Sequence, residues 1–162
     1  MRKRNKFKLG RLSISRRLSV SDYLIITSDR AILCSPVDFG VPQFGGARED
    51  QDQNYIFKQG HSRADGYIKK SFHQIRDLFG KGQALDLVPY IHGVGFDYTA
   101  YGRFGVIGML MLEAWEELQD EGRIPKGLYL HWGGLWKSRD GKKLGWDMAH
   151  FEIRDYPQIE RL

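Results

Sequence analysis

Three short segments of the chain concentrate side chains that could bind a metal ion or move a proton. His73 lies in the first segment, Asp86 in the second, and Asp147 and His150 in the third. Two imidazoles and one carboxylate suit a catalytic Zn²⁺, which keeps a further position open for water. His73, Asp86 and His150 could therefore form a zinc site.

The sequence around these residues favours such a site. Asp86 lies within the apolar run 85–88, where a buried carboxylate needs a cation or a metal ion as its partner. His150 alternates with apolar residues along a predicted strand, so its side chain should point away from Phe151. Asp147 lies three residues before His150 and could reach the attacking water without being a ligand.

The bulk composition is that of a soluble globular domain. The 162 residues suffice for one domain, and 41% of them are hydrophobic and 28% charged. Cys34 is the single cysteine and cannot form a disulfide within the chain. No stretch approaches the roughly 20 apolar residues of a membrane-spanning helix. The apolar residues 24–26 are too few for a secretion signal, so we expect synthesis as a cytoplasmic protein.

The net charge of +5 is unevenly distributed. Eight basic residues precede the first acid, Asp22, whereas the rest of the chain has 17 basic and 20 acidic residues. We expect residues 1–12 to form a loose basic arm and residues 13–162 to form the folded domain. The arm would be a solvated leader or would bind a polyanion such as an anionic cell-wall polymer. Nucleic acid is less favoured, because no predicted helix has basic residues along one face.

The elements that must position these residues follow from the hydrophobic pattern. The clearest is a helix over 103–121, whose apolar stripe consists of residues 107, 110, 111, 114, 115 and 118. Further helices are predicted over 20–34 and 48–59, and strands over 37–41, 83–90 (with a break at Pro89), 128–132 and 148–153. We therefore predict a single α+β domain with a small, mainly antiparallel sheet packed against helices.

Taken in order, the same segments resemble the M15 family of zinc peptidases. This family includes the L-alanyl-D-glutamate endopeptidases of phages and bacteria and the D-Ala-D-Ala carboxypeptidases. Its pattern is Ser-x-His, then Gly-x-Ala-x-Asp, then Trp-Gly-Gly-x-Trp, and finally Asp-x-x-His-Phe. The chain carries these four motifs at 71–73, 82–86, 132–136 and 147–151. Each motif is weak alone, but four in the right order are specific, and the resemblance covers roughly residues 7–154.

The resemblance implies a role for each residue of the metal site. His73, Asp86 and His150 would hold the zinc ion, and Asp147 would act as the general base that activates the attacking water.

The resemblance also implies residues that bind the substrate. Arg48 would bind a carboxylate or carbonyl group of a peptidoglycan stem peptide, and Ser71 would support the site through hydrogen bonds. Trp132 and Trp136 would line the groove, although simple core packing is equally compatible with them.

The chain departs from the family pattern between its first two ligands. His73 and Asp86 are 13 residues apart because residues 75–80 form what looks like an insertion. A surface loop of this length costs little free energy, so the two ligands can still meet. Asp77 within the insertion is an alternative ligand, but Asp86 fits the Gly-x-Ala-x-Asp motif better.

The resemblance therefore implies a zinc-dependent peptidase, endolysin-like, that hydrolyses the L-Ala–D-Glu bond of stem peptides. Aspartate at position 147 resembles the endopeptidase branch of the family. A phage endolysin is made in the host cytoplasm and reaches the cell wall at lysis, which would explain the lack of a signal peptide. The alternatives are a D,D- or L,D-carboxypeptidase on the same scaffold and a non-catalytic wall-binding module. We expect a monomer.

Overall fold

The computed structural model describes residues 7–138 and 140–155. Its helices are α1 (Arg11–Arg16), α2 (Asp22–Cys34), α3 (Asp50–Lys58) and α4 (Tyr101–Asp120), with a short 3₁₀ turn at Gly133–Leu135. Its strands are β1 (Phe39–Gly40), β2 (Ala84–Asp86), β3 (Val88–Ile91), β4 (Gly95–Phe96), β5 (Tyr129–Trp132) and β6 (His150–Arg154). The predicted α+β class is confirmed.

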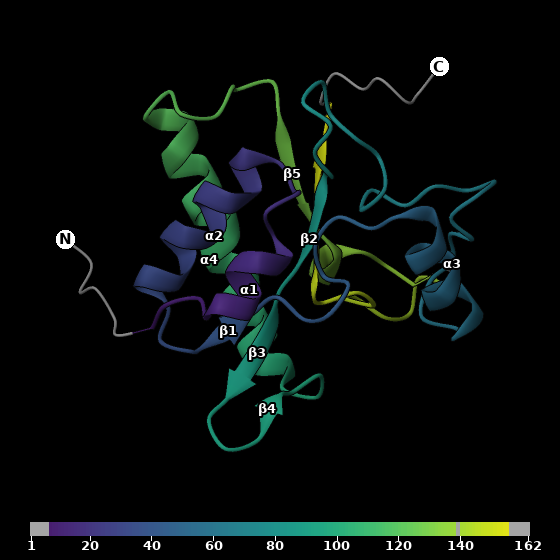
Figure 1. Cartoon of the computed structure of the whole chain (residues 1–162). Helices are drawn as coiled ribbons and strands as arrows, with labels where there is room; N and C mark the ends of the chain where they lie inside the picture. The colour runs from purple at the N-terminus through teal and green to yellow at the C-terminus, as the bar shows by residue number, and fades with distance from the viewer. Residues whose placement is uncertain (1–6, 139, 156–162) are drawn as a thin grey trace.

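The strands form two small antiparallel sheets. One sheet has the order β1-β3-β4, and the other has the order β2-β6-β5 with β6 in the middle. Figure 1 shows α1, α2 and α4 on one side of the β2-β6-β5 sheet and α3 on the other. The larger part of the core therefore lies on the side of α2 and α4.

Helix α4 supplies the centre of that core. Its buried side chains follow the predicted stripe and include Ile107, Met111, Trp115 and Leu118. Fully burying side chains of this size stabilises the fold by roughly 1.5–3 kcal/mol each. Within the residues that the structure describes, no helix is both long and apolar enough to cross a membrane.

The predicted strand over 83–90 is divided differently from the expectation. The chain breaks at Leu87, between β2 and β3, and not at Pro89, which lies within β3 opposite Phe39. Proline fits there because residue 89 takes part in the sheet as an acceptor. Its carbonyl oxygen accepts a hydrogen bond from the Asp97 N–H at 3.0 Å, and this needs no N–H group on residue 89.

The predicted arm over 1–12 is partly packed against the domain. Residues 1–6 lie outside the described part of the chain. Phe7 contacts the core and Leu9 is buried within it, because both are apolar, and α1 begins at Arg11. From residue 7 onward the segment is therefore not loose.

Two of the basic residues near the N-terminus are structural. Arg17 is buried, and its Nη2 pairs with Asp29 Oδ1 at 2.7 Å. Arg16 donates from Nη1 to the carbonyl oxygen of Val41 at 2.9 Å. Both charges are used to attach α1 to its neighbours.

The contact between α4 and β5 gives a direct test of the packing. A Cβ atom at Gly108 would lie 2.3 Å from the Trp132 indole, whereas one at Gly105 on the same helix would meet no atom within 4 Å. We predict that Gly108→Ala lowers the free energy of unfolding by about 1–3 kcal/mol because it overpacks the core. Gly105→Ala should raise it by roughly 0.5–1 kcal/mol through helix propensity. Urea unfolding of both variants measures these changes, and shifts in the same direction would contradict the packing.

Candidate metal centre

The pairing of β2 with β6 brings two of the predicted ligands together. Asp86 is the last residue of β2 and pairs directly with His150, the first residue of β6. Directly paired residues of antiparallel strands point to the same face, with their β-carbons about 4.5–5.5 Å apart. His150 Nδ1 consequently lies 3.1 Å from Asp86 Oδ1.

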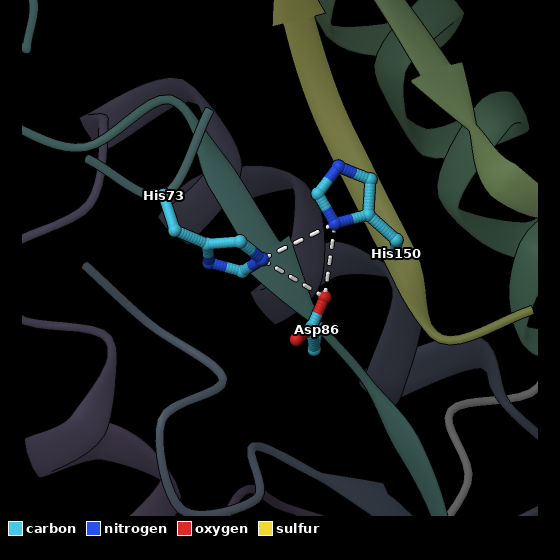
Figure 2. A group of neighbouring side chains, drawn as sticks. All are labelled: His73, Asp86 and His150. Atoms are coloured by element: carbon cyan, nitrogen blue, oxygen red, sulfur yellow. Dashed lines mark hydrogen bonds and ion pairs between the residues drawn. The ribbon is translucent and has the colours of Figure 1, made fainter. Parts of the chain in front are cut away.

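His73 reaches the same point from the loop that precedes β2. Its Nε2 atom lies 3.2 Å from Asp86 Oδ1 and 3.2 Å from His150 Nδ1 (Figure 2). Ligand atoms of a tetrahedral zinc site are roughly 3.3 Å apart, as metal–ligand distances near 2.0–2.1 Å require. The three side chains therefore fit a metal ion, and the structure brings together the set that the sequence indicated.

Each imidazole has a second contact that fixes its orientation. His73 donates from Nδ1 to the carbonyl oxygen of Gly46 at 2.7 Å, so the proton is on Nδ1 and the lone pair of Nε2 faces the other two ligands. On the other side of the site, His150 Nε2 lies 2.9 Å from Glu152 Oε2, which leaves Nδ1 facing the other two ligands. Outer contacts of this kind fix the tautomer of a metal ligand and make it more basic.

Arg48 holds the second oxygen of Asp86. Its Nη2 donates to Asp86 Oδ2 at 2.8 Å, its Nε to the Phe44 carbonyl at 2.6 Å, and its Nη1 to Gln53 Oε1 at 3.0 Å. Ser71 donates from Oγ to the same Gln53 oxygen at 2.9 Å. Arg48 and Ser71 thus belong to one network behind the carboxylate, and direct contact of either with a substrate stays a prediction. Gln53 was missed because nothing in its polar helix sets it apart.

Glu152 was also missed, although the sequence contained a signal. It follows His150 by two residues on β6, so both side chains lie on the same face of the sheet. Glu152 is buried, and Arg154 Nε donates to its Oε1 at 2.8 Å. The spacing of Glu152 and His150 on one strand therefore could have predicted their contact.

Trp132 lies in the core. It is 6% exposed, and its indole N–H donates to the Met148 carbonyl at 2.8 Å. The ring fills the space that Gly134 leaves open, since a Cβ there would lie 2.1 Å from it. The structure thus favours core packing for Trp132, and contact of Trp132 with a substrate stays a prediction. Trp136 is the tryptophan beside the ligands, with its ring centroid 5.3 Å from that of His150.

Asp77, the alternative ligand, closes a turn within the insertion. Its Oδ1 accepts hydrogen bonds from the backbone N–H groups of Phe79 at 2.8 Å and Lys81 at 2.9 Å. It is buried there and does not belong to the group of possible metal ligands. The insertion therefore folds on itself and leaves Asp86 in place.

Burial, hydrogen bonds and neighbouring charges together shift the pKa values of the three possible ligands. Burial lowers the pKa of His73 to about 4, so this ring is neutral at neutral pH. Burial also opposes a charge on His150, but hydrogen bonds to Asp86 and Glu152 outweigh it and raise the pKa to about 10. Burial would raise the pKa of Asp86, yet the imidazoles and Arg48 hold it well below its usual range. Metal binding would consequently replace the proton on His150.

Asp147 lies beside the ligands without being one of them. Its backbone carbonyl accepts a hydrogen bond from the His150 N–H at 3.3 Å. Burial and the nearby charge of Asp86 raise the pKa of the Asp147 carboxyl to about 6. A carboxylate that titrates near neutrality is suited to accept a proton and release it again.

Two imidazoles, one carboxylate and a second carboxylate beside them form the kind of site that zinc hydrolases use. A sequence model of the phage L-alanyl-D-glutamate peptidase family matches residues 5–160, so the chain belongs to this family. The crystal structure of the Serratia marcescens L-Ala D-Glu endopeptidase ChiX matches with a TM-score of 0.64 and 23% sequence identity, over 90% of each chain. This likeness shows a shared fold. No curated protein matches the sequence.

The choice between the two aspartates can be tested by metal binding. We predict that Asp86→Asn weakens zinc binding by more than about 100-fold, since loss of a ligand should exceed the 10–100-fold typical of outer contacts. Asp77→Asn should leave the affinity unchanged because Asp77 only closes a turn. Competition with a chelator measures both, and circular dichroism checks that each variant folds. Zinc binding that survives in Asp86→Asn but not in Asp77→Asn would reverse the assignment.

The contact between Glu152 and His150 gives a second test. Glu152→Leu removes the acceptor for His150 Nε2–H and should weaken zinc binding by about 10–100-fold. Glu152→Gln keeps an acceptor oxygen and should bind zinc more tightly than Glu152→Leu. Equal zinc affinity of the wild type and Glu152→Leu would show that His150 needs no such support.

Proposed function

We propose that this protein is a zinc-dependent peptidoglycan peptidase that hydrolyses the L-Ala–D-Glu bond of stem peptides. The observation that carries the proposal is the meeting of His73 Nε2, Asp86 Oδ1 and His150 Nδ1, separated by 3.1–3.2 Å, beside Asp147. Membership of the phage L-alanyl-D-glutamate peptidase family supports the choice of bond.

The ligand chemistry supports zinc as the metal. Imidazole nitrogens suit Zn²⁺, whereas Mg²⁺ and Ca²⁺ prefer oxygen ligands throughout. When bound, zinc would polarise the scissile carbonyl and lower the pKa of a water molecule toward neutrality.

The protein's own side chains have separate tasks in this reaction. Asp147 is largely ionised at neutral pH, so it takes a proton from the attacking water and passes it to the leaving nitrogen of D-Glu. Glu152 and the Gly46 carbonyl keep the two imidazoles turned toward the metal. Arg48 keeps Asp86 ionised, and the small exposed part of its side chain, 11%, would contact a carbonyl or carboxylate of the stem peptide.

Digestion of purified stem peptides tests this function. Mass spectrometry should show fragments that begin with D-Glu. Loss of a terminal D-Ala alone would identify a carboxypeptidase on this scaffold. Absence of both products, together with absence of bound zinc, would instead identify a wall-binding module.

As part of this proposal the protein acts as a monomer on the cell wall after its release from the host cytoplasm. Basic residues near the N-terminus, such as the exposed Arg11, would hold it on anionic wall polymers.

Asp147→Asn separates catalysis from metal binding. We predict a fall in kcat of at least about 100-fold, because the amide cannot accept the proton, with zinc affinity unchanged. In the wild type, kcat should fall as the pH drops through the pKa of Asp147, since the protonated acid cannot act as a base. A bound cation favours the ionised form, so this limb should lie at or below about pH 6. Full activity of Asp147→Asn would exclude Asp147 as the base.

A further inference from the structure

A row of aromatic rings leads from the metal centre outward to an arginine. The Trp136 ring centroid lies 5.3 Å from that of His150, and the Trp146 centroid lies 5.6 Å from that of Trp136. Cζ of Arg63 lies 4.7 Å from the Trp146 ring centroid. Trp146 is 45% exposed, and Arg63 is exposed as well. The row therefore begins at a metal ligand and ends at side chains exposed to solvent.

The backbone that carries Arg63 is tied to the metal centre through Gln53. This buried side chain donates from Nε2 to Ser62 Oγ at 2.8 Å and to the Ala64 carbonyl at 2.9 Å, on either side of Arg63. Its Oε1 accepts from Arg48, which holds the ligand carboxylate. Position 63 is thus fixed relative to the ligands, although it lies in a loop.

The charge of Arg63 is available to a ligand. The arginines nearer the ligands are each paired with a carboxylate of the protein, namely Arg48, Arg76 and Arg154. Arg63, in contrast, forms no ion pair with any carboxylate of residues 7–138 and 140–155. A guanidinium that rests on an aromatic ring keeps N–H groups that can bind a carboxylate with two hydrogen bonds.

We propose that Arg63, Trp146 and Trp136 form a subsite that binds a free carboxylate of the stem peptide away from the scissile bond. This inference rests on the proposed function. D-Glu is joined to the next residue through its side-chain carboxyl, so its α-carboxylate stays free, and the third residue can add another. The tryptophan rings accommodate the aliphatic part of the peptide, and Arg63 selects the acidic form over the amidated one.

The test compares two peptides on the zinc-loaded enzyme. One is N-acetyl-L-Ala-γ-D-Glu-L-Lys, and the other is the same peptide with both α-carboxyl groups amidated. The wild type should cleave the acidic peptide with roughly tenfold higher kcat/KM, a moderate value for a charge-assisted hydrogen bond at an exposed site. Arg63→Gln should raise KM for the acidic peptide and abolish the preference. Arg63→Lys should retain part of the preference.

Arg123→Gln is the matched control. It removes the same charge from an exposed position just beyond the end of α4, which Figure 1 shows on the opposite side of the molecule from α3. The preference should survive in this variant, and an equal loss in both variants would show a bulk charge effect and overturn the subsite. A preference that persists in Arg63→Gln, or that is absent from an active wild type, would also overturn it and leave the proposed function standing. Cleavage of neither peptide by the wild type would contradict the proposed function and the subsite with it.

Discussion

The register between β2 and β6 is the constraint on which the site depends. It pairs Asp86 with His150 on one face of the sheet, and it pairs Leu85 with Phe151 on the other. Leu85 and Phe151 are completely buried. A slip of one residue would turn a ligand away from the site and would also move a large apolar side chain out of the core. The free energy that buries the core therefore holds the metal ligands in position.

The sequence predicted most where a single physical signal dominated. The apolar stripe of α4 placed that helix within two residues at its N-terminus, because the 3.6-residue periodicity repeats over about three turns. Pro89 was misread because a proline can lie in a strand where only its carbonyl is needed. The burial of Trp132 could not be predicted, because a residue's place in a motif does not show which way it faces. Gln53 could not be found, since its importance comes from contacts with residues distant in the sequence.

Motif residues serve packing as well as chemistry in this fold. A Cβ atom at Gly133 would lie 2.2 Å from the Asp147 carbonyl oxygen, and one at Gly134 would lie within the Trp132 ring's contact distance at 2.1 Å. Gly133 therefore lets the segment that carries Asp147 approach the end of β5 closely, and Gly134 leaves room for the Trp132 ring. The position of the proposed base depends on the absence of a side chain at Gly133.

Because Asp77 closes a turn between His73 and Asp86, the number of residues between these two ligands can vary. Its hydrogen bonds are satisfied within the loop, and Leu78 and Phe79 project outward with 58% and 78% of their surface exposed. Asp86 is held by β6 and Arg48. His73 is held by the Gly46 carbonyl and by Arg76 at the start of the insertion. This turn is accordingly a place where a peptide tag or a short additional segment could be inserted into the chain while the metal centre keeps its shape.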